Sequence, residues 1–319
     1  MIGGVVLAKP RILVIGNSCV DFHVKTRRLA EKGEKVVTPY DYEFVPGGRG
    51  LFSAVAACQL SSDVLVCTRV GDDTYGDKLR SVYVGKGIDP RFIITDKKRK
   101  TGLDTYITEG VSLPRVISCP GANAALCDED IEEAFMSYPD AVLFHFELSD
   151  NVIFEAVKQA NKNKVPVMID PCRENLREFD FDLLGDIEIF SPNAEETYQM
   201  TGIVPDDVES CLRACIRIIN LIKCHYVVIK LGSKGSFVFD GVYSQIVPAL
   251  STQENFRGAV GSVFNASLLH GYLRSGDIVE AAKFANAVSS LCLTKEGTFK
   301  SIPELDEVEE YIKNNSSDF

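Results

Sequence analysis

The chain has 319 residues, of which 45% are hydrophobic and 25% charged, and its 34 basic and 45 acidic side chains give a net charge of −11. This acidity argues against nucleic-acid binding, and the one basic cluster, Lys97-Lys98-Arg99-Lys100, is typical of a solvated loop. No apolar run reaches the ~18 residues that a membrane span needs, and the N-terminus lacks the features of a signal peptide. We therefore expect a cytoplasmic protein with no membrane partner.

Ten cysteines are scattered along the chain, no two of them in a C-x-x-C pair. Only four histidines accompany them, so a clustered zinc site is not expected. Several cysteines lie inside apolar runs, and we interpret the set as small buried thiols in a reducing cytoplasm.

Short apolar runs alternate with helical segments along most of the chain. The predicted strands are 11–15, 63–70, 141–146, 165–170, 187–190 and 226–231. The predicted helices are 51–60, 74–85, 128–136, 151–163, 194–201, 206–222, 259–274 and 277–294, with a hairpin at 234–248 and a frayed charged tail at the end. This alternation predicts right-handed crossovers and an α/β three-layer sandwich, in which a mostly parallel central sheet has helices on both faces.

Two segments break the alternation, because they are extended and no helix separates their strands. We predict that they form a small antiparallel sheet, a lid over a cleft at the carboxyl ends of the main strands. The lid would comprise 34–46 and 101–118, and the large domain 1–33, 47–100 and 119–319.

Two of the glycine-rich or small-residue turns immediately precede helices. Gly47-Gly48-Arg49-Gly50 would let the backbone approach a ligand closely, although a tight turn into a buried helix explains it equally well. Gly258-Ala259-Val260-Gly261-Ser262 would present free N–H groups to an anion, or Ser262 would be a simple helix cap.

Two further motifs follow predicted strands. Asn193 and Glu196 have the spacing of a capping box, or they project into the cleft and organise a hydrated Mg²⁺. The run Lys230-Leu231-Gly232-Ser233-Lys234-Gly235 is either a hairpin connection or a loop that places backbone beside a nucleotide.

Taken in order, these motifs resemble the ribokinase, or PfkB-type, family of carbohydrate kinases, and ribokinases themselves most of all. The resemblance runs from about Ile12 to Pro303. It also includes Gly16-x₄-Asp21, Gly71-Asp72-Asp73-x-x-Gly76, Gly121-Ala122-Asn123-Ala124-Ala125-Leu126, Glu147 and Phe264-Asn265-Ala266. The resemblance implies a transferase that moves the γ-phosphoryl group of ATP, with Mg²⁺, to a primary hydroxyl of a ribose-like sugar.

The same resemblance assigns a role to each candidate site residue. It places the sugar at Asp21, Gly47, Gly48, Arg49, Phe52 and Glu147. It places the nucleotide at Asn193, Lys230, Gly232, Gly235 and Asn286, and magnesium, through water, at Glu196. It makes Ala259, Val260 and Gly261 an anion hole, puts Ser262 at the position of the general base, and suggests a homodimer through the lid.

The departures from the family pattern concern the chemistry. Ser262 replaces the aspartate that takes the hydroxyl proton, and between Asp240 and Asp277 the only carboxylate is Glu254. A positioned base contributes about 10²–10⁴-fold, or roughly 3–5 kcal/mol of barrier lowering. A serine hydroxyl, with its very high pKa, does not take that proton at neutral pH.

Other departures concern the ligand sites. Arg49 stands for the family's lysine, while Phe52 and Cys19 stand for asparagines. Phe256 stands for an aspartate tied to monovalent-cation binding, so dependence on such a cation is doubtful.

Three functions remain to be weighed. The first is a silent relative, a pseudokinase, that binds nucleotide or a small ligand, or serves as a subunit or scaffold. The second is an active sugar or nucleoside kinase with altered specificity. The third, a Rossmann dehydrogenase, is disfavoured because no G-x-G-x-x-G turn follows the first strand. The pattern of losses favours the first, with nucleotide binding retained.

Overall fold

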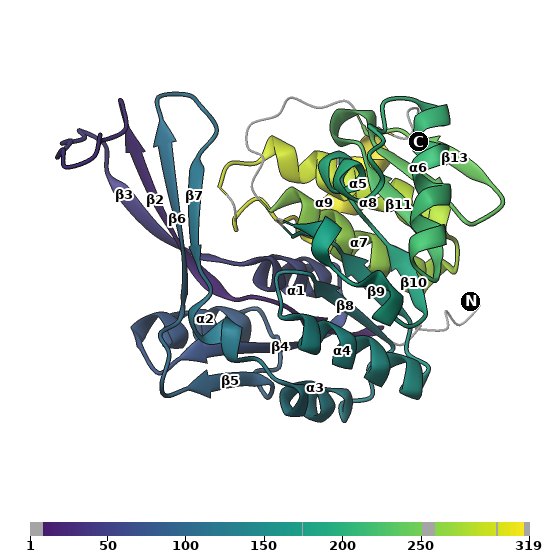
Figure 1. Ribbon diagram of the computed structural model, residues 1–319, viewed down its shortest axis with the longest axis horizontal. Coiled ribbons are helices and arrows are strands. Elements are labelled where there is room, and N and C mark those ends of the chain that lie inside the picture. The colour runs from purple at the N-terminus through teal and green to yellow at the C-terminus, as the bar shows by residue number, and fades with distance from the viewer. Residues whose placement is uncertain (1–8, 174, 251–258, 298, 316–319) are drawn as a thin grey trace.

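The computed structural model describes residues 9–173, 175–250, 259–297 and 299–315. Its main body is a nine-stranded sheet between two layers of helices (Figure 1). From edge to edge, the strands are β13 (Ser244–Val247), β12 (Ser236–Phe239), β11 (Cys224–Lys230), β10 (Ile187–Phe190), β9 (Val167–Asp170), β8 (Ala141–His145), β1 (Arg11–Ile15), β4 (Asp63–Gly71) and β5 (Ile93–Asp96). All neighbours from β11 to β5 pair in parallel, and the hairpin β12–β13 completes the sheet antiparallel, so the mostly parallel sheet is confirmed.

The strands are apolar along their whole length because both faces of the sheet are covered. In β1, Ile12 and Val14 pack into one hydrophobic cluster, while Leu13 and Ile15 pack into the other. Successive side chains of a strand point to opposite faces, so such a run serves both layers.

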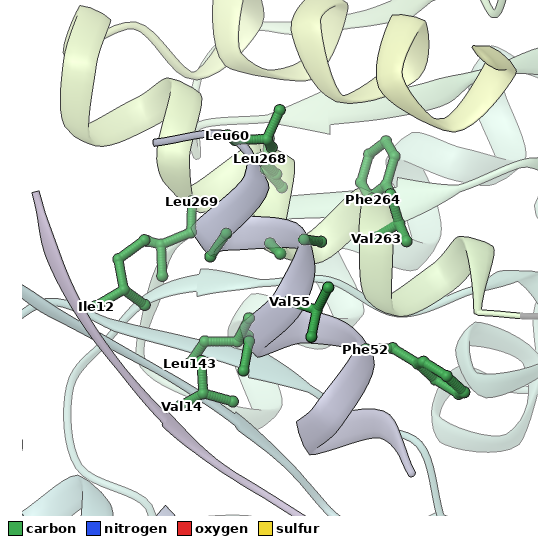
Figure 2. Close-up of a cluster of buried hydrophobic side chains, with 14 of the residues drawn as sticks. Ile12, Val14, Phe52, Val55, Leu60, Leu143, Val263, Phe264, Leu268 and Leu269 are labelled. Atoms are coloured by element: carbon green, nitrogen blue, oxygen red, sulfur yellow. The ribbon is translucent and has the colours of Figure 1, made fainter. Parts of the chain in front are cut away.

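Helices of the first layer pack on the face that contains Ile12 and Val14. They are α1 (Arg49–Gln59), α2 (Thr74–Gly85), α7 (Val260–Ser275), α8 (Ile278–Thr294) and α9 (Leu305–Asn314). Figure 2 shows side chains of α1 and α7, among them Val55 and Leu268, meeting over the strands.

Helices of the second layer cover the opposite face. They are α3 (Asp128–Phe135), α4 (Asp150–Asn163) and α6 (Val208–Leu221), with the short α5 (Ala194–Thr201) beside them. The three-layer prediction is therefore confirmed.

The C-terminal segment is helix α9 rather than the frayed tail that we expected. Leu305, Val308 and Ile312 recur at helical spacing and pack on the first-layer core. The many charged residues of this segment lie on the opposite face of the helix. Because they outnumber the three apolar residues, the helical spacing was not recognised in the sequence.

A second sheet projects from the main body (Figure 1), with four strands in the order β3 (Tyr42–Gly47), β2 (Cys19–Thr26), β6 (Gly102–Glu109) and β7 (Arg115–Cys119). The two predicted segments thus do build one small sheet. Its two outer pairs are antiparallel, and its central pair, β2 with β6, is parallel.

Strand β2 was not expected in the small sheet, since we assigned residues 1–33 to the large domain. It alternates polar and apolar residues, which is typical of a sheet with one open face. The alternation was overlooked because β2 begins only four residues after β1 ends.

All ten cysteines are free and seven of them are buried, as expected. Along the described part of the chain, every helix is too short or too polar to cross a membrane.

Candidate active site

A cavity of about 640 Å³ opens at the carboxyl ends of β10 and β11. It collects most of the residues predicted to hold nucleotide, magnesium and the transferred group. Its lining consists of Arg49, Asn193, Glu196, Lys230, Leu231, Gly232, Ser233, Gly235, Ala249, Leu250, Val260, Gly261, Phe264, Asn286, Ser289, Ser290 and Leu293.

Asn193 and Glu196 form a capping box at the start of α5. Asn193 Oδ1 accepts from the Glu196 N–H at 2.8 Å, and Glu196 Oε2 accepts from the Asn193 N–H at 2.7 Å. Both residues nevertheless line the cavity, and Glu196 Oε1 has no hydrogen bond among the described residues. Burial raises the pKa of Glu196, although the nearby Lys230 ammonium opposes that rise. The capping and magnesium interpretations are therefore compatible.

Lys230 is the last residue of β11, and its Nζ donates to Asp170 Oδ1 at 2.8 Å. The turn after it includes Gly232 and Gly235, both with positive φ. A Cβ on Gly235 would lie 2.1 Å from the carbonyl oxygen of Val247, so this turn can approach the hairpin only with glycine. The turn is a hairpin connection and also part of the cavity wall.

Asn286 of α8 lines the cavity beside this hairpin and is buried. Its Nδ2 donates to the carbonyl oxygens of Val247 and Pro248 and to Ser236 Oγ. These bonds commit its amide nitrogen to holding the hairpin.

The start of α7 supplies backbone rather than side chains to the cavity. Its cap, Ala259, has a positive φ of 24° and makes no side-chain capping bond. Val260 and Gly261 line the cavity, and a Cβ on Gly261 would meet no atom within 4 Å. The first N–H groups of a helix have no partner within it, and at the positive end of the helix dipole they fit an anion.

Ser262 is 2% exposed and does not line the cavity, and its carbonyl oxygen lies 3.3 Å from Ser53 Oγ. The residue at the position of the base is thus withdrawn from the cavity surface. Gly258, Glu254 and Phe256, on which the rest of this motif and the cation prediction depend, lie outside the described residues.

Arg49 begins α1 and brings a second cation to the cavity. Its Nε donates to Glu147 Oε1 at 2.8 Å, and its Nη1 lies 3.8 Å from Asp170 Oδ2. Glu147 follows β8, and its Oε2 lies 3.5 Å from Asn17 Nδ2. Arg49, which was itself predicted to bind sugar, therefore links the cavity to Glu147, a second residue with that prediction.

Asp21 lies where β2 of the small sheet meets the main body. Gly47 packs so closely on it that a Cβ there would lie 2.0 Å from Asp21 Oδ1. Burial, and then the neighbouring Asp104, raise the pKa of Asp21 to about 7. Gly48, the cap of α1, has φ 98°, and a Cβ would lie 2.5 Å from the carbonyl oxygen of Asn17.

Phe52 was predicted to crowd the sugar. It is 6% exposed and belongs to the first-layer core, and its ring projects from the first turns of α1 (Figure 2). It does not line the cavity.

Three polar residues near the cavity escaped the sequence analysis: Ser53, His145 and Asp170. Asp170 ends β9, and a carboxylate at the end of a buried strand was an available signal. His145 and Ser53 lie within apolar stretches, where no local pattern distinguishes them.

The pfkB family carbohydrate kinase model matches residues 9–305. The chain belongs to this family, and the predicted ribokinase-like fold is confirmed. Its relatives include ribokinases and a deoxyribokinase.

The deoxyribokinase of Salmonella typhi is 27% identical over 306 residues, covering 95% of this chain and 99% of the relative. The ribokinase of Haemophilus influenzae is 27% identical over 305 residues, with 95% and 98% covered. The structure of Arabidopsis thaliana ribokinase complexed with ribose and ATP superposes with a TM-score of 0.85 at 24% identity, over 96% of this chain and 99% of that one.

Proposed function

We propose that this chain binds ATP with Mg²⁺ in the 640 Å³ cavity and has lost most of the family's capacity to transfer the phosphoryl group to a sugar. The observation that carries the proposal is the difference between neighbouring residues at the start of α7. Val260 and Gly261 line the cavity at the start of a helix, whose first N–H groups have no partner within the helix, whereas Ser262, at the position of the base, is buried and carries no carboxylate.

Charge in the cavity supports nucleotide binding. Lys230 and Arg49 place an ammonium and a guanidinium at one end of it, next to the start of α7. Phosphates are bound by cations and helix N-termini of this kind.

The donor set also suits magnesium. Glu196 lines the cavity, and its Oε1 accepts no hydrogen bond from the part of the chain that the structure describes; oxygen is the ligand that Mg²⁺ prefers. When bound there through water, the ion would offset the charge of the phosphates. Asn193 and the α5 backbone hold the Glu196 carboxylate in place.

An active kinase with altered acceptor specificity is the second candidate. Asp21 and Glu147 keep the family's carboxylates, and phosphoryl transfer depends mainly on positioning and charge stabilisation, so some rate persists without a base. Arg49 in place of lysine then accounts for a changed acceptor.

Titration calorimetry with Mg–ATP, followed by turnover assays over a panel of sugars and nucleosides, separates these candidates. Binding with no acceptor-dependent turnover supports the first. Turnover of about 1–100 s⁻¹ with any acceptor, the usual kinase range, overturns it in favour of the second. Absence of Mg–ATP binding overturns both.

We also propose a homodimer through the small sheet. Its edge strands β3 and β7 each lack a second neighbour among the described residues. Tyr42, Val116 and Ile117 are exposed there, and open strand edges pair readily with another chain. A dimeric mass in light scattering that becomes monomeric in Ile117→Lys supports this, and a monomeric wild type overturns it.

A further inference from the structure

A row of buried polar side chains runs behind the cavity wall. From Lys230 Nζ it passes to Asp170 Oδ1 at 2.8 Å, and from Asp170 Oδ2 to His145 Nδ1 at 3.1 Å. His145 Nε2 lies 3.1 Å from Ser53 Oγ, which lies 3.3 Å from the carbonyl oxygen of Ser262. Asp170, His145 and Ser53 are each 0% exposed. The row therefore joins β11, β9, β8, α1 and α7.

Donors and acceptors in the row assign the protons of the His145 ring. Although burial alone would raise it, the Lys230 ammonium and the His145 hydrogen bond hold the pKa of Asp170 well below its usual range, so Asp170 is a carboxylate. A carboxylate only accepts, hence Nδ1 of His145 carries the proton. With the Nδ1 proton directed at Asp170, Nε2 of a singly protonated ring is the acceptor, and the Ser53 hydroxyl donates its one proton to it. The 3.3 Å approach of Ser53 Oγ to the carbonyl oxygen of Ser262 is then a packing contact that uses no second proton.

The elements that the row joins are those that supply the cavity with positive charge. Lys230 comes from β11, and Arg49 comes from α1, one turn before Ser53. The N–H groups of Val260 and Gly261 come from α7, beside Ser262. Small displacements of such charged groups and N–H donors greatly reduce the electrostatic stabilisation that they give to a bound phosphate.

His145 is the central member of the row and is held firmly. A Cβ on Gly16 would lie 2.9 Å from its Cδ2, so the ring packs directly on the turn after β1. Without the ring, Asp170 Oδ2 would keep only Arg49, at 3.8 Å. A buried carboxylate oxygen without a close donor is costly, so Asp170 would draw the guanidinium of Arg49 inward and away from the cavity.

We propose that His145 is a positioning residue for phosphate binding. Its ring holds Asp170 and Ser53 in place, and through them it fixes the relative positions of Arg49, Lys230 and the start of α7. The inference rests on the proposed binding of Mg–ATP.

The chain offers a matched control. Ser62 Oγ and His270 Nδ1 form a second buried serine–histidine hydrogen bond of 2.8 Å, between the turn after α1 and α7. Neither residue lines the cavity. A variant that loses this bond shows how much the loss of a buried serine–histidine pair, away from the cavity, changes the unfolding temperature and the Mg–ATP affinity.

The experiment compares wild type, His145→Leu, Ser53→Ala and His270→Leu by thermal unfolding and by calorimetry with Mg–ATP. We expect both histidine variants to unfold at lower temperature, and only His145→Leu to weaken Mg–ATP binding, by roughly 10-fold. Ser53→Ala should weaken Mg–ATP binding less than His145→Leu does. The double variant Ser53→Ala/His145→Leu should bind Mg–ATP almost as tightly as His145→Leu alone, because both substitutions interrupt the same row of hydrogen bonds.

Unchanged Mg–ATP affinity in a folded His145→Leu, with a stability loss like that of His270→Leu, overturns the inference and leaves the proposed function intact. No binding by the wild type overturns the proposed function and this inference with it. Should His145→Leu fail to fold, Ser53→Ala and His145→Gln take its place under the same criteria.

Nitrogen-15 spectra of the four histidine rings in the wild type provide a readout that a purely structural role would not move. The His145 signal, assigned by its loss in His145→Gln, should show the Nδ1–H form and shift when Mg–ATP is added. An Nε2–H form, or a signal unmoved by bound Mg–ATP, overturns the inference.

Discussion

Arg49 donates from Nε to Glu147 Oε1 at 2.8 Å, and this ion pair joins the cavity proposed to bind nucleotide to a residue predicted to bind sugar. Arg49 lines the cavity, whereas Glu147, which follows β8, does not. A phosphate bound in the cavity would share the guanidinium with Glu147. The charge of a phosphate in the cavity would thus weaken the hold of Arg49 on Glu147, at the predicted sugar site.

Removing that side chain should therefore weaken nucleotide binding. We expect Arg49→Leu to raise the Kd of Mg–ATP about 10-fold in calorimetry, since a charge-assisted phosphate contact is lost. Arg91→Leu is the control, because Arg91 pairs with Asp89 at 2.7 Å and does not line the cavity. Equal affinities of the two variants would contradict a role of Arg49 in phosphate binding.

Restoring the missing carboxylate should restore chemistry. We expect Ser262→Asp to raise acceptor-dependent ATP turnover by about 10²–10⁴-fold, the usual contribution of a general base. Ser262→Asn is the control, since it has nearly the same shape and no basic oxygen. If the two variants turn over ATP equally, the absent base is not what limits the reaction.

Phe52 should behave as a core residue. Because its ring is buried in the first-layer cluster, Phe52→Ala should lower the free energy of unfolding by about 3–5 kcal/mol in urea titration, and Phe52→Leu by much less. A loss well under about 1 kcal/mol for Phe52→Ala would mean that the ring is not held by the core.

Gly47 should tolerate no side chain. Its Cβ would lie 2.0 Å from Asp21 Oδ1, so Gly47→Ala should be destabilising and should displace that carboxylate. Gly85→Ala in α2 is the control, since a Cβ there meets no atom within 4 Å, and helix propensity predicts a gain of about 0.5–1 kcal/mol. Thermal unfolding of both variants measures the difference, and a stable Gly47→Ala would contradict the close packing.

Asp21 should make the protein less stable as the pH rises. Its folded-state pKa of about 7 exceeds the unfolded value near 3.8, so the folded state binds the additional proton between these values. The contribution of Asp21 to the free energy of unfolding should fall between about pH 4 and 7 and then level off. Urea titrations from pH 5 to 8 should show this slope in wild type and not in Asp21→Asn, and parallel curves would contradict it.

The sequence was informative about the candidate site wherever a motif ends a strand or begins a helix. Asn193, Lys230, Gly232 and Gly261 stood out as turns after strands or helix starts and received their roles from the family resemblance, and all four line the cavity. The placement of Phe52 at the sugar site stays a prediction, because a family position identifies a residue's neighbours along the chain, while the structure shows only that its ring is buried in the first-layer core.

By itself, the sequence determined most of the strands and helices in their order along the chain, though not β2, β5 or α9, as well as the two buried faces of the sheet and the absence of a carboxylate at position 262, since periodicity and residue identity are local properties. Only the tertiary structure decided that β2 joins the small sheet, and that His145 meets Ser53, 92 residues away, and Asp170, 25 residues away. A buried polar side chain bonds with whatever partner the packed elements bring to it, and that partner is chosen by how β8, β9 and α1 meet in space.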